Sequence, residues 1–268
     1  MLWSQGTYIS DQAREIGIRA EDGVTGMVVM ISLELTAKEA VKAVRRKDLI
    51  IVIDVLRSGS SMLNALANGA EALVPAKTLA EAYEIKREHP EYLLAGERKA
   101  LRPRGFDFGN SPLEFKRKKV QGRTLIFTTT SGTAALMRSK PAGKVLMGAF
   151  LNARKVAEKA LAAARGTGGG ISIALSGRKG LFSLEDFICG GAIVSNLFVD
   201  GVDLSDASVA AFLSWRHVAN SLFTNVMKGE HARHLASLGF ERDIEFSCQL
   251  DLFKIVPIYK DGVIKRGD

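Results

Sequence analysis

The sequence predicts an α/β fold, a three-layer α/β/α sandwich whose central sheet is mixed but largely parallel. The first observation is that strand-like and helix-like segments alternate over most of the 268 residues. The second is the run LIIVID at residues 49–54, which is apolar up to its last residue and rich in β-branched side chains. Such a run is typical of a strand that is buried on both faces of a parallel sheet.

The predicted elements follow one another along the chain. After the strand at 49–54, the segment 60–69 has helical spacing and ends at a glycine. Thr78 begins the next helix, with Glu81 three residues on as the partner in a capping box. Further strands are predicted at 72–75, 92–95, 124–128, 144–148 and 170–175. Further helices are predicted at 132–138, 153–164, 184–199 and 206–239, before a strand pair over 251–264 that turns at 260–262.

The domain organisation is expected to be simple. Residues 1–26 are polar, punctuated by glycine and poorly periodic, so we interpret them as an N-terminal extension. Residues 27–268 are predicted to form a single domain, because no linker rich in Pro, Gly or Ser divides them.

Charge and cysteine content narrow the class of protein. Lys and Arg number 37 against 29 Asp and Glu, but this excess is spread evenly over both halves of the chain. This distribution of charge is more typical of a protein that binds a small anionic substrate than of one that binds a nucleic acid. No stretch approaches the roughly 18 apolar residues of a membrane-spanning helix. The two cysteines lie far apart, and the start lacks the pattern of a signal peptide, so we expect a cytoplasmic protein, with a homodimer left open.

Three segments share one pattern, a buried strand followed by a loop of small polar residues and then a helix start. They are residues 51–61, 126–133 and 171–186. In open α/β sheets ligands bind outside the carboxyl ends of the strands, where backbone N–H groups at helix starts favour anions. A fourth segment, 96–114, follows another predicted strand and leads into a short helix with Ser111 and Glu114 as its expected capping box. These loops predict an anion-binding site.

Acidic and basic residues are interleaved in these loops. Carboxylates are ligands that Mg²⁺ prefers, and arginines can donate two hydrogen bonds to a phosphate or a carboxylate. A surface ion-pair network would explain any one of these residues, but together they favour a metal with an anionic ligand. The acidic residues are Asp54, Glu97, Asp107, Glu185 and Asp186, and the arginines beside them are Arg57, Arg98 and Arg178.

Other candidate motifs are interpreted as structural. Cys189 lies on an apolar helix face, where packing explains it better than nucleophilic chemistry. His231 and His234 have a spacing that suits one helix face, and an exposed helix with basic neighbours explains them better than a metal site. The sequence also has no Walker loop and no GxGxxG motif after a strand.

Several motifs resemble the 2-phosphosulfolactate phosphatase (ComB) family. They are DVLR at 54–57, GER at 96–98 and especially GFDFGNSP at 105–112. The later strings TTxxGT at 128–133, SGR at 176–178 and LED at 184–186 agree in order and spacing. The resemblance covers roughly residues 30–268, and the string at 105–112 is specific.

This resemblance implies a three-layer fold, Mg²⁺ dependence, and hydrolysis of (R)-2-phospho-3-sulfolactate to sulfolactate and phosphate in coenzyme M biosynthesis. The sequence departs from the usual family pattern at residues 57–61 (RSGSS), at Ser131, and at Lys99 and Ala100, where the family has glycines. These positions lie in loops that would shape the pocket. The resemblance therefore predicts the class of reaction more directly than it predicts the identity of the substrate.

We expect Asp54, Glu97 and Asp107 to hold Mg²⁺ while water attacks phosphorus directly, with Glu185 or Asp186 as a further ligand or general base. Arg57, Arg98 and Arg178 would clamp the anionic groups of the substrate. The remaining expected substrate-binding residues are Asn110, Ser111, Thr129, Ser131, Gly132, Thr133 and Ser176. Two alternatives stay open: a Mg²⁺-dependent phosphatase for another phosphorylated hydroxy acid, and a non-catalytic protein that binds anions or nucleic acid on the same fold.

Overall fold

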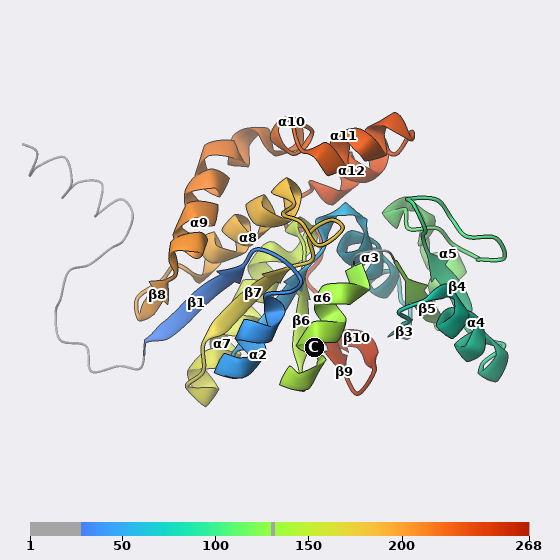
Figure 1. Ribbon diagram of the computed structural model, residues 1–268, viewed down its shortest axis with the longest axis horizontal. Helices are drawn as coiled ribbons and strands as arrows, with labels where there is room; N and C mark the ends of the chain where they lie inside the picture. The colour runs from blue at the N-terminus through green and yellow to red at the C-terminus, as the bar shows by residue number, and fades with distance from the viewer. Residues whose placement is uncertain (1–27, 130–131, 268) are drawn as a thin grey trace, which may run out of the picture.

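The computed structural model describes residues 28–129 and 132–267. Over this part of the chain ten strands form one sheet, in the order β4-β5-β3-β10-β9-β6-β2-β7-β1-β8, with helices on both faces (Figure 1). The predicted three-layer α/β/α architecture is therefore confirmed. The extension proposed for residues 1–26 lies outside the described residues.

The strands are β1 (Val29–Glu34), β2 (Leu49–Ile53), β3 (Ala72–Pro75), β4 (Leu93–Gly96), β5 (Thr124–Thr128), β6 (Val145–Gly148), β7 (Ile171–Leu175), β8 (Val202–Leu204), β9 (Val256–Lys260) and β10 (Val263–Gly267). The helices are α2 (Ala40–Arg46), α3 (Ser60–Ala67), α4 (Leu79–Glu88), α5 (Arg117–Val120), α6 (Gly132–Ser139), α7 (Ala153–Thr167), α8 (Leu184–Leu197), α9 (Asp206–Val218), α10 (Leu222–Val226), α11 (Glu230–Ser237) and α12 (Glu241–Ser247). None of these helices is long and apolar enough to cross a membrane.

The sheet consists of two parallel blocks joined by the C-terminal hairpin. One block is β4-β5-β3 and the other is β6-β2-β7-β1-β8, and all neighbours within each block run parallel. Strands β9 and β10 lie between the blocks and pair antiparallel with β6 and β3. The last strands of the chain thus complete the middle of the sheet, which gives it its mixed character.

Side chains of β2 alternate between two hydrophobic cores. Ile51 and Ile53 pack with α7 and α8 in one core, whereas Ile50 and Val52 pack with α2, α3 and α6 in the other. This alternation follows from the period of two in a strand. Because both faces are covered by helices, the strand is apolar along its whole length, which is why its sequence is so easily recognised.

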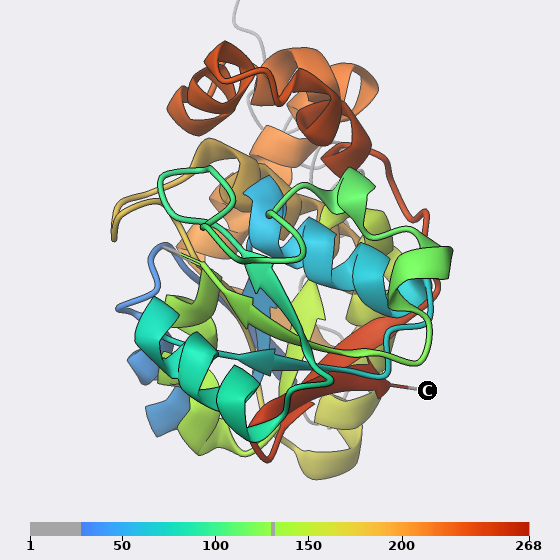
Figure 2. The same cartoon turned by 90° about the vertical axis from the view of Figure 1, so that its right-hand side faces the viewer.

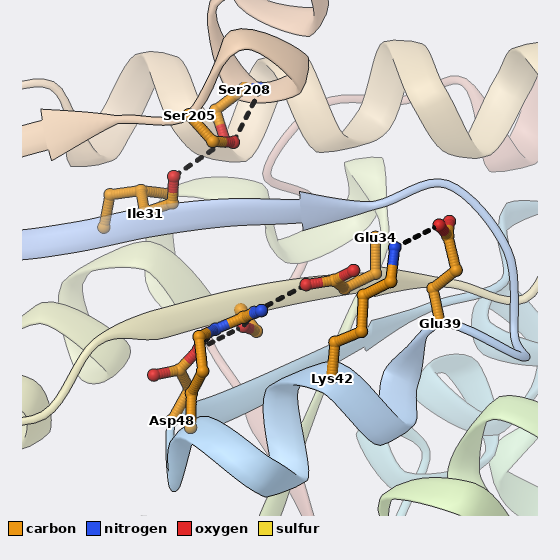
Figure 3. Close-up of polar contacts among 9 residues, drawn as sticks. Ile31, Glu34, Glu39, Lys42, Asp48, Ser205 and Ser208 are labelled. Atoms are coloured by element: carbon orange, nitrogen blue, oxygen red, sulfur yellow. Dashed lines mark hydrogen bonds and ion pairs between the residues drawn. The ribbon is translucent and has the colours of Figure 1, made fainter.

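Polar contacts fix the helices at the outer edge of the sheet. Arg46, at the end of α2, donates to the buried carboxylates of Glu34 and Asp48 at 2.5 and 2.8 Å and to the Ser172 hydroxyl at 2.8 Å. Figure 3 shows the Glu34 and Asp48 carboxylates at the two ends of this contact, above α2. The same view shows Ser208 of α9 beside Ile31, whose backbone carbonyl accepts the Ser208 hydroxyl proton at 2.9 Å.

Most predicted elements are present, and Thr78 caps α4 by accepting from the Glu81 N–H. The predicted helix over 206–239 is instead divided into α9, α10 and α11, with a short turn at Ala219–Ser221 and Gly229 before α11. Strands β1 and β8 and helices α2, α5 and α12 were not among the predicted elements. The chain from α9 to α12 passes over one end of the sheet, as both Figure 1 and Figure 2 show.

Candidate active site

A cavity of about 560 Å³ opens where the loops after β2, β4 and β7 meet helix α11. Asp54 lines it from the loop after β2, Glu97 from the loop after β4, and Arg178 from the loop after β7. His231 and His234 line it from α11. The structure therefore brings together residues that are far apart in sequence, at the carboxyl ends of parallel strands, where α/β sheets bind ligands.

The loop after β2 is shaped by Asp54. Its carboxylate accepts the Ser58 N–H at 3.1 Å, and its backbone carbonyl accepts the Gly59 N–H at 2.7 Å, which closes the turn Val55–Gly59. A Cβ at Gly59 would lie 2.4 Å from the Asp54 carbonyl oxygen, so the turn needs glycine at this position. The turn holds the Asp54 carboxylate at the wall of the cavity.

Asp186 braces two of the loops. Its two carboxylate oxygens accept the Val55 N–H at 2.8 Å and the Gly177 N–H at 3.0 Å. Burial, followed by the nearby Glu185 and Asp54 carboxylates, raises the pKa of Asp186 well above its ordinary value. Asp186 therefore positions the loops after β2 and β7, and it is not among the residues that line the cavity.

Arg57 lines the cavity, and its buried guanidinium is also held by other residues of the protein. Its guanidinium donates to Asp243 at 2.8 Å and to the Ala100 carbonyl at 2.6 Å, and it stacks 3.9 Å from the centre of the Phe240 ring. Asp243 also accepts the Ser111 hydroxyl proton at 2.6 Å. The charge of Arg57 is thus balanced by Asp243, and this buried ion pair fastens α12 onto the site.

Two further residues that were predicted to bind the substrate, Arg98 and Ser111, also make hydrogen bonds within the protein. Arg98 donates to the Thr128 hydroxyl at 2.8 Å and to the Glu97 carbonyl at 2.6 Å, and it is not among the residues that line the cavity. Ser111 makes no capping bond to the short helix Pro112–Glu114 because its hydroxyl donates to Asp243. The Glu114 carboxylate accepts the Gly109 N–H at 2.9 Å, so the expected capping box is absent.

Asp107 lies outside the cavity. Its carboxylate accepts the Leu94 N–H at 2.8 Å at the edge of β4, and the residue is exposed between the buried Phe106 and Phe108. The expected metal triad of Asp54, Glu97 and Asp107 is therefore not assembled. The physical reason is that Asp107 satisfies an edge-strand N–H, a role that the sequence pattern did not reveal.

Two hairpin turns with nearly the same sequence flank the cavity. Arg98 and Leu101 exchange backbone hydrogen bonds across Lys99 and Ala100, and Arg178 and Leu181 do so across Lys179 and Gly180. All four central residues have positive φ, from 52° to 79°, as in the tight turns that match the twist of a hairpin. Both turns place a lysine at the cavity. Each contains the string Arg-Lys-x-Leu, a local repeat that sequence analysis missed.

His231 is the principal residue that sequence analysis did not place in the site. Its Nδ1 lies 2.8 Å from Oε1 of Glu185, which is nearly fully buried in the first turn of α8. His231 is partly buried and lines the cavity. The surface-helix interpretation of His231 is thus corrected, whereas His234 on the same helix is exposed.

The Asp54 carboxyl resists ionisation. Burial is the largest cause that raises its pKa from 3.8 to about 6, and the Glu185 and Glu97 carboxylates raise it further, while His231 and the Ser58 N–H act in the opposite direction. The raised pKa therefore reflects mainly the loss of solvation of this buried carboxylate. A cation beside Asp54 would favour its ionised form.

Several buried oxygens in these loops have no hydrogen-bond partner among the described residues. They are Asn110 Oδ1, Thr129 Oγ1, Ser176 Oγ and Glu185 Oε2. Buried polar atoms are normally paired, and of these residues Asn110 lines the cavity, so its unpaired Oδ1 is available to a polar ligand there. Ser131 lies outside the described residues, while Gly132 begins α6 and nothing is described of the Thr133 side chain.

Cys189 is fully buried in the core between α8 and the sheet. Burial raises the pKa of its thiol well above the ordinary value. The packing interpretation therefore agrees with its surroundings, because a nucleophilic cysteine needs an accessible thiolate.

Comparison with known proteins identifies the family. The sequence profile of the family described as "2-phosphosulpholactate phosphatase" matches residues 35–262. This chain belongs to that family.

It is 40% identical over 218 residues to a "Probable 2-phosphosulfolactate phosphatase" of Clostridium tetani, covering 81% of this chain and 91% of the relative. A protein of the same name from Thermotoga maritima is 41% identical over 213 residues, covering 80% and 89%. The chain is thus a phosphoric monoester hydrolase.

The residues present fit a magnesium ion. Among residues 28–129 and 132–267, no three His, Cys, Asp or Glu side chains gather into a complete metal cage. Mg²⁺ does not need one, because it is usually held by one or two carboxylates together with water and substrate phosphate. Asp54 and Glu97 would supply the carboxylates, and Asn110 Oδ1 is an oxygen on the same cavity without a hydrogen-bond partner among the described residues.

The raised pKa of Asp54 leads to a test on stability. Because the folded protein holds this proton more tightly than the unfolded chain does, ionisation of Asp54 lowers the free energy of unfolding as pH rises from about 4 to 6. Asp54→Asn should therefore increase that free energy by roughly 3 kcal/mol at pH 8 in EDTA, and by much less at pH 4.5. Urea unfolding at the two pH values measures this.

The matched control is Asp107→Asn, which removes an exposed carboxylate and should give no pH-dependent gain. A less stable Asp54→Asn protein at pH 8 would contradict the account of a buried carboxylate that is poorly solvated.

Proposed function

We propose that this chain is a Mg²⁺-dependent phosphatase that hydrolyses (R)-2-phospho-3-sulfolactate to (R)-3-sulfolactate and phosphate. The observation that carries the proposal is that one cavity combines the carboxylates of Asp54 and Glu97 with the cationic groups of Lys99, Arg178 and Lys179. Carboxylates suit the metal, and the cationic groups suit a substrate with phosphate, carboxylate and sulfonate groups. The names of the relatives support the same substrate.

Asp54 and Glu97 would hold the ion, with Asn110 as a neutral oxygen donor. When bound, Mg²⁺ supplies positive charge that polarises the phosphoryl group and favours attack by water. The hydroxyl groups of Thr129 and Ser176 are buried without partners in the described residues and can donate to phosphoryl oxygens. Catalysis of phosphoryl transfer depends mostly on such positioning and on electrostatic stabilisation.

The two hairpins supply recognition of the rest of the substrate. Lys99 and Lys179 are exposed at the cavity, and Arg178 is only partly exposed, with its guanidinium 3.1 Å from Glu230. They stand on either side of the cavity, so they can attract the carboxylate and sulfonate while the phosphoryl group lies near Asp54. Substrate selection would then depend on charge at the rim rather than on Arg57, whose charge Asp243 already balances.

A second candidate is a phosphatase for another phosphorylated hydroxy acid. The residues that favour it are Lys99 and Ala100, which occupy positions where the family usually has glycines. Both residues line the cavity. A change of side chain at this rim can alter which distal anion is accepted without altering the chemistry near Asp54.

The direct test is phosphate release from 2-phosphosulfolactate and from phosphate esters of other 2-hydroxy acids, each with Mg²⁺ and with excess EDTA. We expect release from 2-phosphosulfolactate that EDTA abolishes. Metal-dependent release from a different ester alone would favour the second candidate. No release from any ester, with salt-dependent binding of RNA or DNA, would instead favour the non-catalytic alternative.

Removal of the rim charge gives a separate prediction. Lys99→Ala should raise KM for a substrate with a carboxylate and a sulfonate by roughly three- to tenfold, as expected for the loss of one partly solvated ion pair, with kcat nearly unchanged. Lys118→Ala on α5 removes the same charge from an exposed site away from the cavity lining and serves as the control. Equal KM values for the two variants would contradict a role for the hairpins in recognition.

A further inference from the structure

We propose that His231 is the general acid that protonates the leaving group, and that Glu185 is the positioning residue that holds it. This inference rests on the proposed phosphatase function. It gives a catalytic role to a residue that the sequence pattern had placed on an exposed helix. The observation behind it is the 2.8 Å contact between His231 Nδ1 and Glu185 Oε1 at the wall of the cavity.

The geometry fixes which ring nitrogen can act. Glu185 is almost fully buried, so its carboxylate holds the Nδ1–H of His231 in a fixed direction. Nε2 is then the ring nitrogen left for a group in the cavity. With the Glu185 carboxylate on the Nδ1 side of the ring, a proton for the leaving group would come from Nε2.

The surroundings favour a proton donor at this place. The carboxylates of Asp54 and Glu97 line the same cavity and are the proposed metal ligands, so another group is needed to supply the proton. His234 also lines the cavity, but slight burial, Arg178, His231 and Lys179 lower its pKa, so it is less able to carry a proton. His231 is thus the histidine on the cavity that has both a carboxylate partner and partial burial.

The chemistry of the substrate needs such a group, because the leaving oxygen belongs to an alkyl hydroxy acid and becomes strongly basic as its bond to phosphorus breaks. In the step, a water oxygen forms a bond to phosphorus while the bond from phosphorus to the ester oxygen breaks. The electron pair of the broken bond stays on the ester oxygen, which takes the proton from His231 Nε2. The attacking water keeps one hydrogen in the phosphate and releases the other to solvent, which returns a proton to His231.

Esters with different leaving groups test this role. The purified full chain with Mg²⁺ would be assayed on an alkyl substrate, the phosphate ester of lactate, and on p-nitrophenyl phosphate, whose leaving group needs no protonation. His231→Gln should lower kcat on the alkyl ester by about 100-fold or more, but on the aryl ester by less than about tenfold. Glu185→Gln should also lower kcat more on the alkyl ester than on the aryl ester, but by smaller factors. This variant keeps the His231 ring and only weakens the contact that orients it.

His234→Gln is the matched control from the same helix, and any loss it causes should be similar for both esters. Urea unfolding of each variant reports whether it is folded, and Glu185→Gln keeps the test valid if His231→Gln is not. Equal losses on the two esters in His231→Gln and Glu185→Gln would overturn this inference and leave the phosphatase assignment standing. Failure of the wild-type protein to release phosphate from any ester would overturn both.

Discussion

Buried negative charge at the carboxyl ends of the strands is the constraint on which the rest of the site depends. Asp54, Glu97, Glu185 and Asp186 are each less than one-tenth exposed, and buried carboxylates are costly unless they are paired. Asp186 accepts two backbone N–H groups and one oxygen of Glu185 lies 2.8 Å from His231 Nδ1, yet burial raises the pKa of both Asp186 and Asp54. These contacts therefore offset only part of the cost of burial, and the proposed cation at Asp54 would offset more of it.

The same constraint explains why the C-terminal helices contribute to a site whose first residue, Asp54, lies in the N-terminal part of the chain. Helix α12 brings Asp243 to Arg57, and α11 brings His231 to Glu185, so the C-terminal helices complete contacts that the earlier loops leave open. The last two strands also join the two parallel blocks of the sheet. A truncation within the C-terminal region would thus remove both the middle of the sheet and one wall of the cavity.

The fold could be predicted largely from sequence because strands such as β2 are buried on both faces and read as continuous apolar runs. The site could be predicted only in part. Asp54, Glu97 and Arg178 follow strands, and that position indicates where they lie, but Asp107 satisfies an edge N–H of β4 that the pattern does not reveal. The contacts of Arg57 and His231 could not be predicted because their partners, Asp243 and Glu185, lie 186 and 46 residues away in sequence. Such pairing becomes visible only when the chain is folded.

The most direct test of the account is calorimetric titration of Mg²⁺ into the wild-type protein and three variants, Asp54→Asn, Glu97→Gln and Asp107→Asn. The account predicts that the wild-type protein and Asp107→Asn bind the ion with similar affinity, and that Asp54→Asn and Glu97→Gln lose at least about tenfold of it. Binding that survives in Asp54→Asn and Glu97→Gln but fails in Asp107→Asn would contradict it, because the metal would then lie outside the cavity.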